Sequence, residues 1–269
     1  MQSPVELSKV WALTKRDIYN WSTYKSQILT TVASSIVGIA AWGVNADYRN
    51  ISVPQYNTDY VSFLIVGILV TNLILPLGSG IQKQLNPWTL ETILMTGIKT
   101  PTFVLGTSLW TYILSVVLFI PQLYLGIYVF KAVLVVNFIS LAVAILISGL
   151  IIFCLAMIST GIRIVTKVTD PITWGLAMAA SLLSGMTYPV SQLNTYIPGL
   201  STVSWLLPQT WIYHIVRLSS LEAGSLLNPG VAEAFLATLA YALVLIPISV
   251  YVYRWGLQRA KKDGTLGWY

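Results

Sequence analysis

Six stretches of the sequence are apolar and contain no Asp, Glu, Lys, Arg or His. They lie at residues 28–44, 61–80, 102–129, 132–159, 171–186 and 234–253. A helix needs about 20 apolar residues, within a range of about 17–25, to cross the hydrocarbon of a bilayer. Only 9% of all residues are charged, whereas a soluble domain carries about a quarter. The pattern predicts an all-α, polytopic membrane protein with six transmembrane helices in a single transmembrane domain, 1–269.

The basic residues predict how these spans are oriented. Twelve of the 15 Lys and Arg residues fall in the N-terminal segment, the second and fourth connections and the C-terminal tail. The other three are Arg49, Lys131 and Arg217. Short cytoplasmic loops are enriched in Lys and Arg, so both termini are expected in the cytoplasm of a cell whose plasma membrane holds the chain. The basic residues lie between apolar stretches, which indicates membrane topology and not nucleic-acid binding.

One further stretch, 203–221, is apolar enough to resemble a seventh span. A crossing there would move the four C-terminal basic residues outside and weaken the charge asymmetry. Pro189, Pro198 and Pro208 also divide this region into pieces of about ten residues, a length typical of re-entrant or interfacial segments. We therefore keep six spans and interpret 187–233 as an outer region of re-entrant helices.

The N-terminal segment, 4–25, has the pattern of an amphipathic helix. Ser3, Pro4 and Glu6 form a helix-start signal. Apolar and small residues then recur at helical spacing, namely Leu7, Trp11, Thr14, Ile18 and Trp21. This pattern favours a helix that lies in the cytoplasmic membrane interface. The alternative is an ordinary cytoplasmic lead-in with Trp21 and Tyr24 as aromatic anchors.

The residues missing from the spans exclude several classes of function. Ion-coupled carriers usually hold a charged group within the membrane, and these spans contain none. The single histidine, His214, lies outside the spans, and the single cysteine, Cys154, is expected to be a small buried residue. The sequence offers no catalytic set, no metal-binding cluster and no Gly-x-x-x-x-Gly-Lys-Ser/Thr loop. The chain is therefore not expected to be an enzyme or to bind a cofactor.

The connection between the second and third stretches contains a predicted helix at 87–96. Asn86 suits the N-cap, Pro87 suits the first helical position, and Gly97 suits the C-terminal end. The helix is apolar apart from Glu91. Two interpretations stay open: it packs back on its own bundle, or it inserts into a groove of a partner protein.

Three segments together carry a resemblance to a known family. They are 89–96 (TLETILMT) with 103–106 (FVLG), 183–193 (LSGMTYPVSQL), and 206–211 (LLPQTW) with 214–217 (HIVR). In this order, with six spans and an amphipathic start, they resemble the permeases of ABC-2 type transporters over nearly the whole chain. The resemblance implies a transmembrane subunit that pairs with a second copy or a related permease.

The resemblance also implies partners. Two separate ATP-binding cassette subunits would bind ATP and Mg, and each permease would contact one of them through a coupling helix. That helix would consist of the 87–96 segment, with contacts from Pro87, Trp88, Leu90, Glu91, Ile93, Leu94 and Met95.

The family further implies a dimer seam at spans one and five and a substrate cavity between spans one, two and five. Small residues that suit close helix packing are Ser34, Gly38, Gly175, Ala179 and Gly185. Packing within one chain is an equal alternative for them. The cavity candidates are Thr71, Asn72, Trp174, Met178 and Ser181, and the alternative for each is a core or lipid-facing position.

The leading hypothesis is the permease of an ATP-driven exporter of drug-like, lipid or other amphipathic compounds by alternating access. One alternative is a permease for lipid-linked polysaccharide. Another, from a different class, is a membrane scaffold without transport activity.

Overall fold

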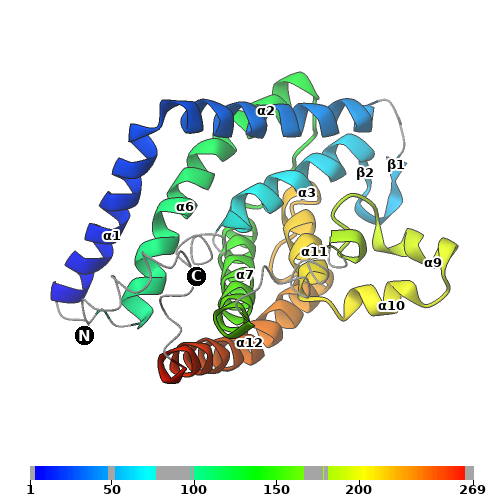
Figure 1. Cartoon of the computed structure of the whole chain (residues 1–269). Helices are drawn as coiled ribbons and strands as arrows, with labels where there is room; N and C mark the ends of the chain where they lie inside the picture. Colours follow the sequence, from blue (N-terminus) through cyan, green and yellow to red (C-terminus); the bar gives the residue numbers. More distant parts are fainter. Residues whose placement is uncertain are drawn as a thin grey trace.

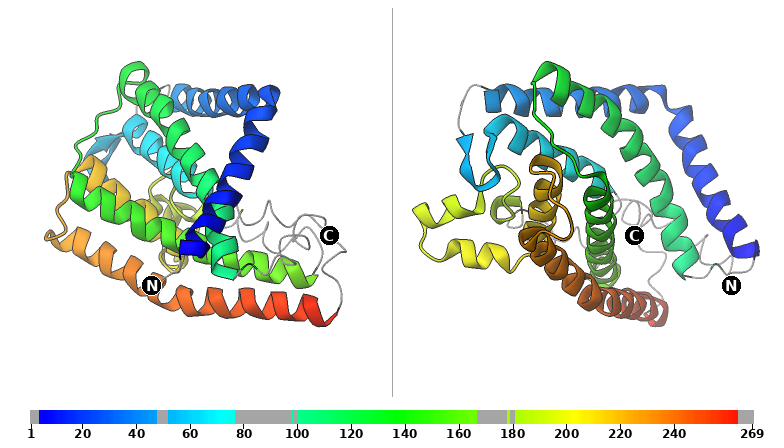
Figure 2. Two further views of the ribbon diagram at one scale, coloured as in Figure 1. Left: turned by 90° about the vertical axis from the view of Figure 1, so that its left-hand side faces the viewer. Right: turned by 180° about the vertical axis from the view of Figure 1, so that it is seen from behind.

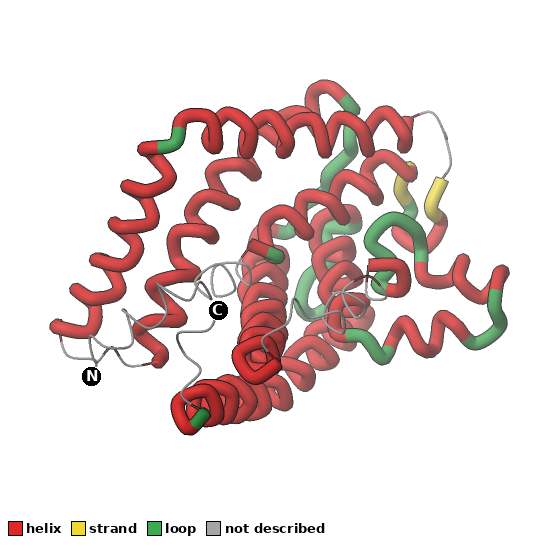
Figure 3. The backbone as a smooth tube through the Cα atoms, in the orientation of Figure 1, coloured by secondary structure: helices red, strands yellow, loops and turns green. Residues whose placement is uncertain are grey.

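The computed structural model describes residues 4–47, 52–76, 98, 100–166, 178 and 181–263. The regular secondary structure of the described chain is helical apart from one small hairpin, in which β1 (Ser52–Val53) pairs antiparallel with β2 (Thr58–Asp59) (Figure 3). The longer helices are α1 (Pro4–Thr23), α2 (Lys25–Asp47), α3 (Tyr60–Ile74), α6 (Thr100–Tyr124), α7 (Phe138–Thr166), α11 (Pro208–Leu221) and α12 (Pro229–Lys262). The shorter elements are η1 (Pro54–Tyr56), the π-helix η2 (Leu125–Val129), η3 (Val190–Gln192), α9 (Leu193–Tyr196) and α10 (Leu200–Trp205).

Among the described residues, four helical segments are long and apolar enough to cross a membrane. They lie within α2, in α6 with its continuation η2, in α7, and in α12. Helix α3 is apolar but has only 15 residues in the described chain. These helices indicate a membrane-embedded protein, as the sequence predicted. Of the predicted fifth span, 171–186, only residues 178 and 181–186 are described, and the predicted helix 87–96 lies outside the described residues.

Several predicted boundaries differ from the observed ones. The predicted span 132–159 begins too early, because residues 131–137 are non-helical and bond to the end of α11. Val135 N donates to Ser220 O at 3.0 Å, and Ala223 N donates to Val135 O at 2.8 Å. The predicted span 234–253 lies within α12, which begins at Pro229 and continues to Lys262. The apolar stretch 203–221 is divided between α10 and α11, and Pro208 occupies the start of α11.

Helices α7 and α12 run in the same direction and pack along much of their length (Figures 1 and 2). Their backbones lie close together where Gly161 faces Gly256. A Cβ atom at position 161 would lie 2.7 Å from Val252 O and 2.9 Å from the Tyr253 Cα. A Cβ at position 256 would collide with the Gly161 carbonyl oxygen. This crossing therefore requires residues without side chains, as small residues allow in membrane helices.

Helix α1 lies along the N-terminal part of α6 (Figure 1). Leu13 is buried against Gly106, where an added Cβ would lie 2.8 Å from the Leu13 Cδ1. Thr14 is also buried, and its hydroxyl donates to Gly106 O at 3.3 Å. Leu7 and Trp11, which the sequence placed on the same apolar face as Thr14, stay 61% and 58% exposed. The predicted face is thus divided between a packed strip and an exposed apolar strip.

Candidate functional site

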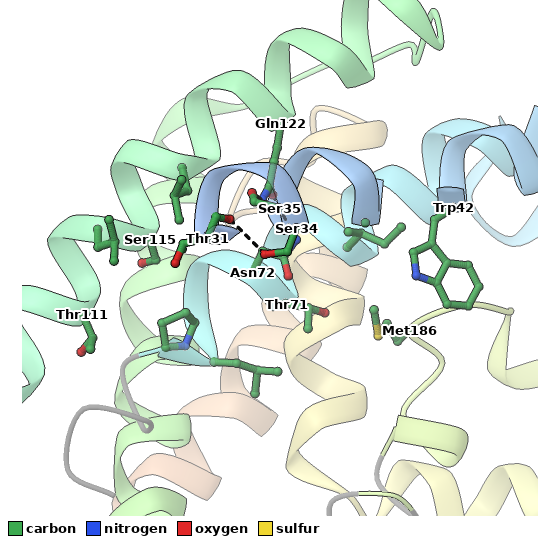
Figure 4. Close-up of a pocket in the computed structure, with 16 residues that line it drawn as sticks. Thr31, Ser34, Ser35, Trp42, Thr71, Asn72, Thr111, Ser115, Gln122 and Met186 are labelled. Carbon is green, nitrogen blue, oxygen red and sulfur yellow. Dashed lines mark hydrogen bonds between the residues drawn. The ribbon is translucent and has the colours of Figure 1, made fainter. Parts of the chain in front are cut away.

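Helices α2, α3 and α6 line an open cavity of about 450 Å³, and Met186 also lines it (Figure 4). This volume falls within the range of small-molecule sites, about 300–1,000 Å³. None of its described lining residues is charged. Half of them carry a hydroxyl or an amide: Thr31, Ser34, Ser35, Thr71, Asn72, Thr111, Ser115 and Gln122.

A chain of side-chain hydrogen bonds joins the three helices at the cavity wall. Asn72 Nδ2 on α3 donates to Gln122 Oε1 on α6 at 3.0 Å. Gln122 Nε2 in turn donates to the Ser35 hydroxyl on α2. Gln122 is only 2% exposed, so a buried amide without these partners would be costly. The network fixes the distance between the helices that form the cavity.

Thr71 connects the cavity to α11. Its hydroxyl donates to Gly67 O at 2.7 Å and lies 2.8 Å from the Tyr213 hydroxyl. Because the single Thr71 proton is directed to Gly67 O, Tyr213 is the donor in the second bond.

The structure places the predicted site residues in different surroundings. Thr71 and Asn72 line the cavity, and so do Ser34 and Gly38, which the sequence assigned to a dimer seam. Met178 and Ser181 are exposed and do not line it. Gly185 is buried in a turn with a φ of 73°. Trp174, Gly175 and Ala179 lie outside the described residues, as do all the predicted coupling residues from Pro87 to Met95. The roles assigned to these residues stay predictions.

Sequence reasoning missed the contribution of α6. Ser108, Thr111, Ser115 and Gln122 follow one another at spacings of three, four and seven, so they share one face of the helix. All four are buried. A polar strip on one face of an otherwise apolar span was the signal that could have identified this wall of the cavity.

A buried arginine lies behind the cavity wall. Arg217 of α11 is 2% exposed. Its Nη1 donates to Gly185 O at 2.6 Å, and its Nη2 donates to Met186 O at 2.5 Å. The guanidinium carbon lies 3.6 Å from the centre of the Phe63 ring, within the range of a cation–π contact. Arg217 therefore connects α3, α11 and the turn that brings Met186 to the cavity.

Gly67 makes this arrangement possible. A Cβ at position 67 would lie 2.5 Å from Met186 O and 2.7 Å from Arg217 Nη2. The turn is held from a second side, because the Tyr60 hydroxyl donates to Thr187 O at 2.9 Å. The backbone at 185–187 is thus fixed by side chains of α3 and α11.

Burial and charge shift the pKa values around Arg217. Burial lowers the pKa of Arg217 to about 10, which leaves it protonated at neutral pH. Burial also raises the pKa of Tyr56 to about 12, so its hydroxyl is neutral and lies 2.8 Å from His214 Nδ1. Burial, and secondarily the nearby Arg217 charge, lowers the pKa of His214 to about 4. His214 is therefore neutral when Arg217 is charged.

This shift predicts that acid destabilises the folded chain. The unfolded chain binds a proton on His214 near pH 6.5, whereas the folded chain does so only near pH 4. Folding stability should fall as the pH drops from about 6.5 to about 4, by up to about 3 kcal/mol. Thermal unfolding measured from pH 7.5 to 4.5 should show a smaller loss for His214→Gln than for the wild type. Equal losses would contradict the proposed neutral state.

Within the described residues, no group of three or more His, Cys, Asp and Glu side chains could hold a metal ion. The cavity offers neutral hydrogen-bonding groups, which suit reversible binding. No protein-family model matches the sequence, and no curated protein matches it either.

Proposed function

We propose that the chain is the transmembrane permease subunit of an ATP-driven exporter of the ABC-2 type. Two permeases, with two separate ATP-binding cassette subunits that bind ATP and Mg, would move an amphipathic compound out of the cell by alternating access. The proposal includes six spans in the plasma membrane, an outer re-entrant region and cytoplasmic termini.

The neutral cavity between α2, α3 and α6 is the observation that carries this proposal. It is large enough for a small amphipathic compound, and its described lining contains no group that could bind or release a proton near neutral pH. Coupling to an ion gradient usually depends on such groups. The sequence also lacks a nucleotide-binding loop, so energy for uphill transport would come from another subunit.

Two features of the fold support the topology and the pairing. Helices α7 and α12 run in parallel, as the fourth and sixth of six alternating spans would. The chain between them must then return across the membrane once, which is the place of the proposed fifth span.

Helix α2 is the least covered of the long apolar helices, with 11% of residues 28–45 buried. Its free surface suits a second permease, in addition to lipid.

The coupling contact offers the direct test. Leu94→Asp and Glu91→Arg should each abolish co-purification of the cassette ATPase. Leu94→Asp adds a charge to the helix and Glu91→Arg reverses one, and either change should prevent the helix from entering an apolar groove of the ATPase. The measurement is the amount of ATPase that co-purifies with the tagged permease. Leu227→Asp is the matched control, since Leu227 is 92% exposed in the outer region, and it should retain the ATPase.

Two results would refute the assignment. If both coupling variants keep the ATPase bound, the helix 87–96 is not the coupling helix. If the wild-type chain retains no ATPase at all, a scaffold without transport activity explains the chain better.

A further inference from the structure

The hydroxyl groups of the cavity have their protons directed away from it. Ser34 Oγ donates to Thr31 O at 3.1 Å, and Thr111 Oγ1 donates to Ser108 O at 2.8 Å. Ser115 Oγ donates to Tyr112 O at 2.8 Å and lies 3.2 Å from Leu73 O. A hydroxyl has one proton and two lone pairs. Each of these side chains therefore offers the cavity an acceptor and not a donor.

The amide groups are only partly used by the network that joins the helices. Asn72 Nδ2 and Gln122 Nε2 each donate one N–H to it, and each amide nitrogen has a second N–H. Within the described part of the chain, Asn72 Oδ1 has no hydrogen-bond partner. The Ser35 hydroxyl accepts from Gln122, and among the described residues no acceptor is seen for its proton. The cavity surface therefore offers acceptor oxygens together with a smaller set of O–H and N–H donors.

The described lining of the cavity offers no charged group that could pair with an ionic ligand. No Lys, Arg or His belongs to the described lining, and no Asp or Glu does. Arg217, a buried cation of α11, directs both Nη atoms to backbone carbonyls and does not line the cavity. In the described lining, an anionic head would find no cation and a cationic head would find no carboxylate. Either charge would lose hydration without gaining an opposite charge.

Apolar side chains complete the lining. Ile68, Leu75, Leu114 and Leu118 supply aliphatic surface, and Trp42 supplies an aromatic one. Trp42 remains 45% exposed, so its ring is accessible to a bound compound. Aromatic rings offer a large and rigid apolar face beside a polar group.

We infer that this cavity binds an uncharged head group with several hydroxyl groups, which both donate and accept hydrogen bonds, such as a polyol, attached to an apolar chain. This inference rests on the proposed function, because it names the class of compound that the exporter would carry. The donors of the head meet the oxygen atoms of Ser34, Thr111, Ser115 and Asn72. The aliphatic side chains contact the start of the apolar chain.

The test compares three dodecyl amphiphiles on the full chain in lipid nanodiscs. They are a maltoside, a primary amine and a phosphate, each with a bromine beside the head group to quench the fluorescence of Trp42. Quenching that is present in the wild type and lost in Trp42→Phe reports occupancy of the cavity. We expect the maltoside to bind about 10-fold or more tightly than the other two, which corresponds to about 1.4 kcal/mol.

Variants then test the acceptors. Thr111→Val and Ser34→Ala should each weaken maltoside binding by about 2- to 10-fold, the value of one lost hydrogen bond. Ser34 is exposed, so its variant should fold even if the Thr111 variant does not. Thr238→Val is the matched control: Thr238 also donates to its own helix, at 2.9 Å, but lies on α12 outside the cavity. Maltoside binding to this variant should be unchanged.

The results separate this inference from the proposed function. Tighter binding of the amine or the phosphate, or maltoside binding that neither cavity variant weakens, overturns the inference. An ATPase that co-purifies and is stimulated only by the amine would leave the exporter standing and refute the polyol class. Selective maltoside binding without any associated ATPase would support the cavity assignment and refute the exporter.

Discussion

Gly256→Leu should destabilise the chain by about 3 kcal/mol or more, because no side chain fits where α12 crosses α7. Even a Cβ atom at position 256 would collide with the Gly161 carbonyl oxygen. The obstacle is backbone and not a flexible side chain, so the two helices must separate. Overpacking a tight interior commonly costs about 1–3 kcal/mol, and leucine adds three further carbon atoms to the collision. The helices would lose their most extensive contact.

The measurement is the temperature at which half of the purified protein is lost from the monodisperse peak in size-exclusion chromatography. Gly230→Leu is the matched control, since Gly230 is exposed on the same helix and an added Cβ there meets nothing within 4 Å. We expect a marked decrease for Gly256→Leu and little change for Gly230→Leu. Equal midpoints for both variants would show that the close crossing does not stabilise the fold.

The contact between Gly161 and Gly256 illustrates what one sequence does not reveal. Gly256 and Ala260 have the same four-residue spacing that singled out Ser34 and Gly38. They lie beyond residue 253, however, where Arg254 and Arg259 interrupt the apolar pattern and end the predicted span. Gly161 has no small residue four positions away. The pairing of these glycines depends on how two distant helices meet, and periodicity along each helix contains no information about that.

The helical, membrane-embedded character was predictable because apolar length alone determines it. The cavity was predictable only in part. Thr71 and Asn72 were conspicuous as polar residues inside an apolar span, and both line the cavity. The prediction did not include α6, whose polar strip contributes Gln122. Which helix forms the third wall is decided by tertiary packing, so spacing within a single helix could not identify it.

The turn at 185–187 shows a second limit. The small size of Gly185 predicts a helix-packing position, whereas the structure gives it a φ of 73° and a carbonyl that accepts from Arg217. A positive φ strongly favours glycine, and a turn position cannot be distinguished from a helix-packing position by size alone. Arg217 itself was predicted to be an outer loop cation. It is buried because α3 supplies Phe63 and the turn supplies two carbonyls.

Replacing Arg217 should give the second large effect. Arg217→Lys should destabilise the chain by about 2–5 kcal/mol, although the charge is kept. A guanidinium can donate to Gly185 O and Met186 O together while it lies flat on Phe63, and an ammonium cannot do so. Each buried carbonyl left without a donor costs about 1–3 kcal/mol, and loss of the contact with Phe63 adds about 0.5–2 kcal/mol.

Arg217→Met separates the two contributions. It removes the charge, so the cost of burying a cation disappears, but both carbonyls lose their donor. If the hydrogen bonds stabilise the turn, Arg217→Lys and Arg217→Met should both lower the midpoint temperature of thermal unfolding. Arg254→Met is the control, because Arg254 is exposed on α12, and it should leave the midpoint unchanged. A variant with methionine at least as stable as the wild type would show that the buried charge costs more than its hydrogen bonds contribute. Met186 lines the cavity. Loss of the hydrogen bond from Arg217 to the Met186 carbonyl should therefore also weaken ligand binding, although none of the residues that contact the head group is changed.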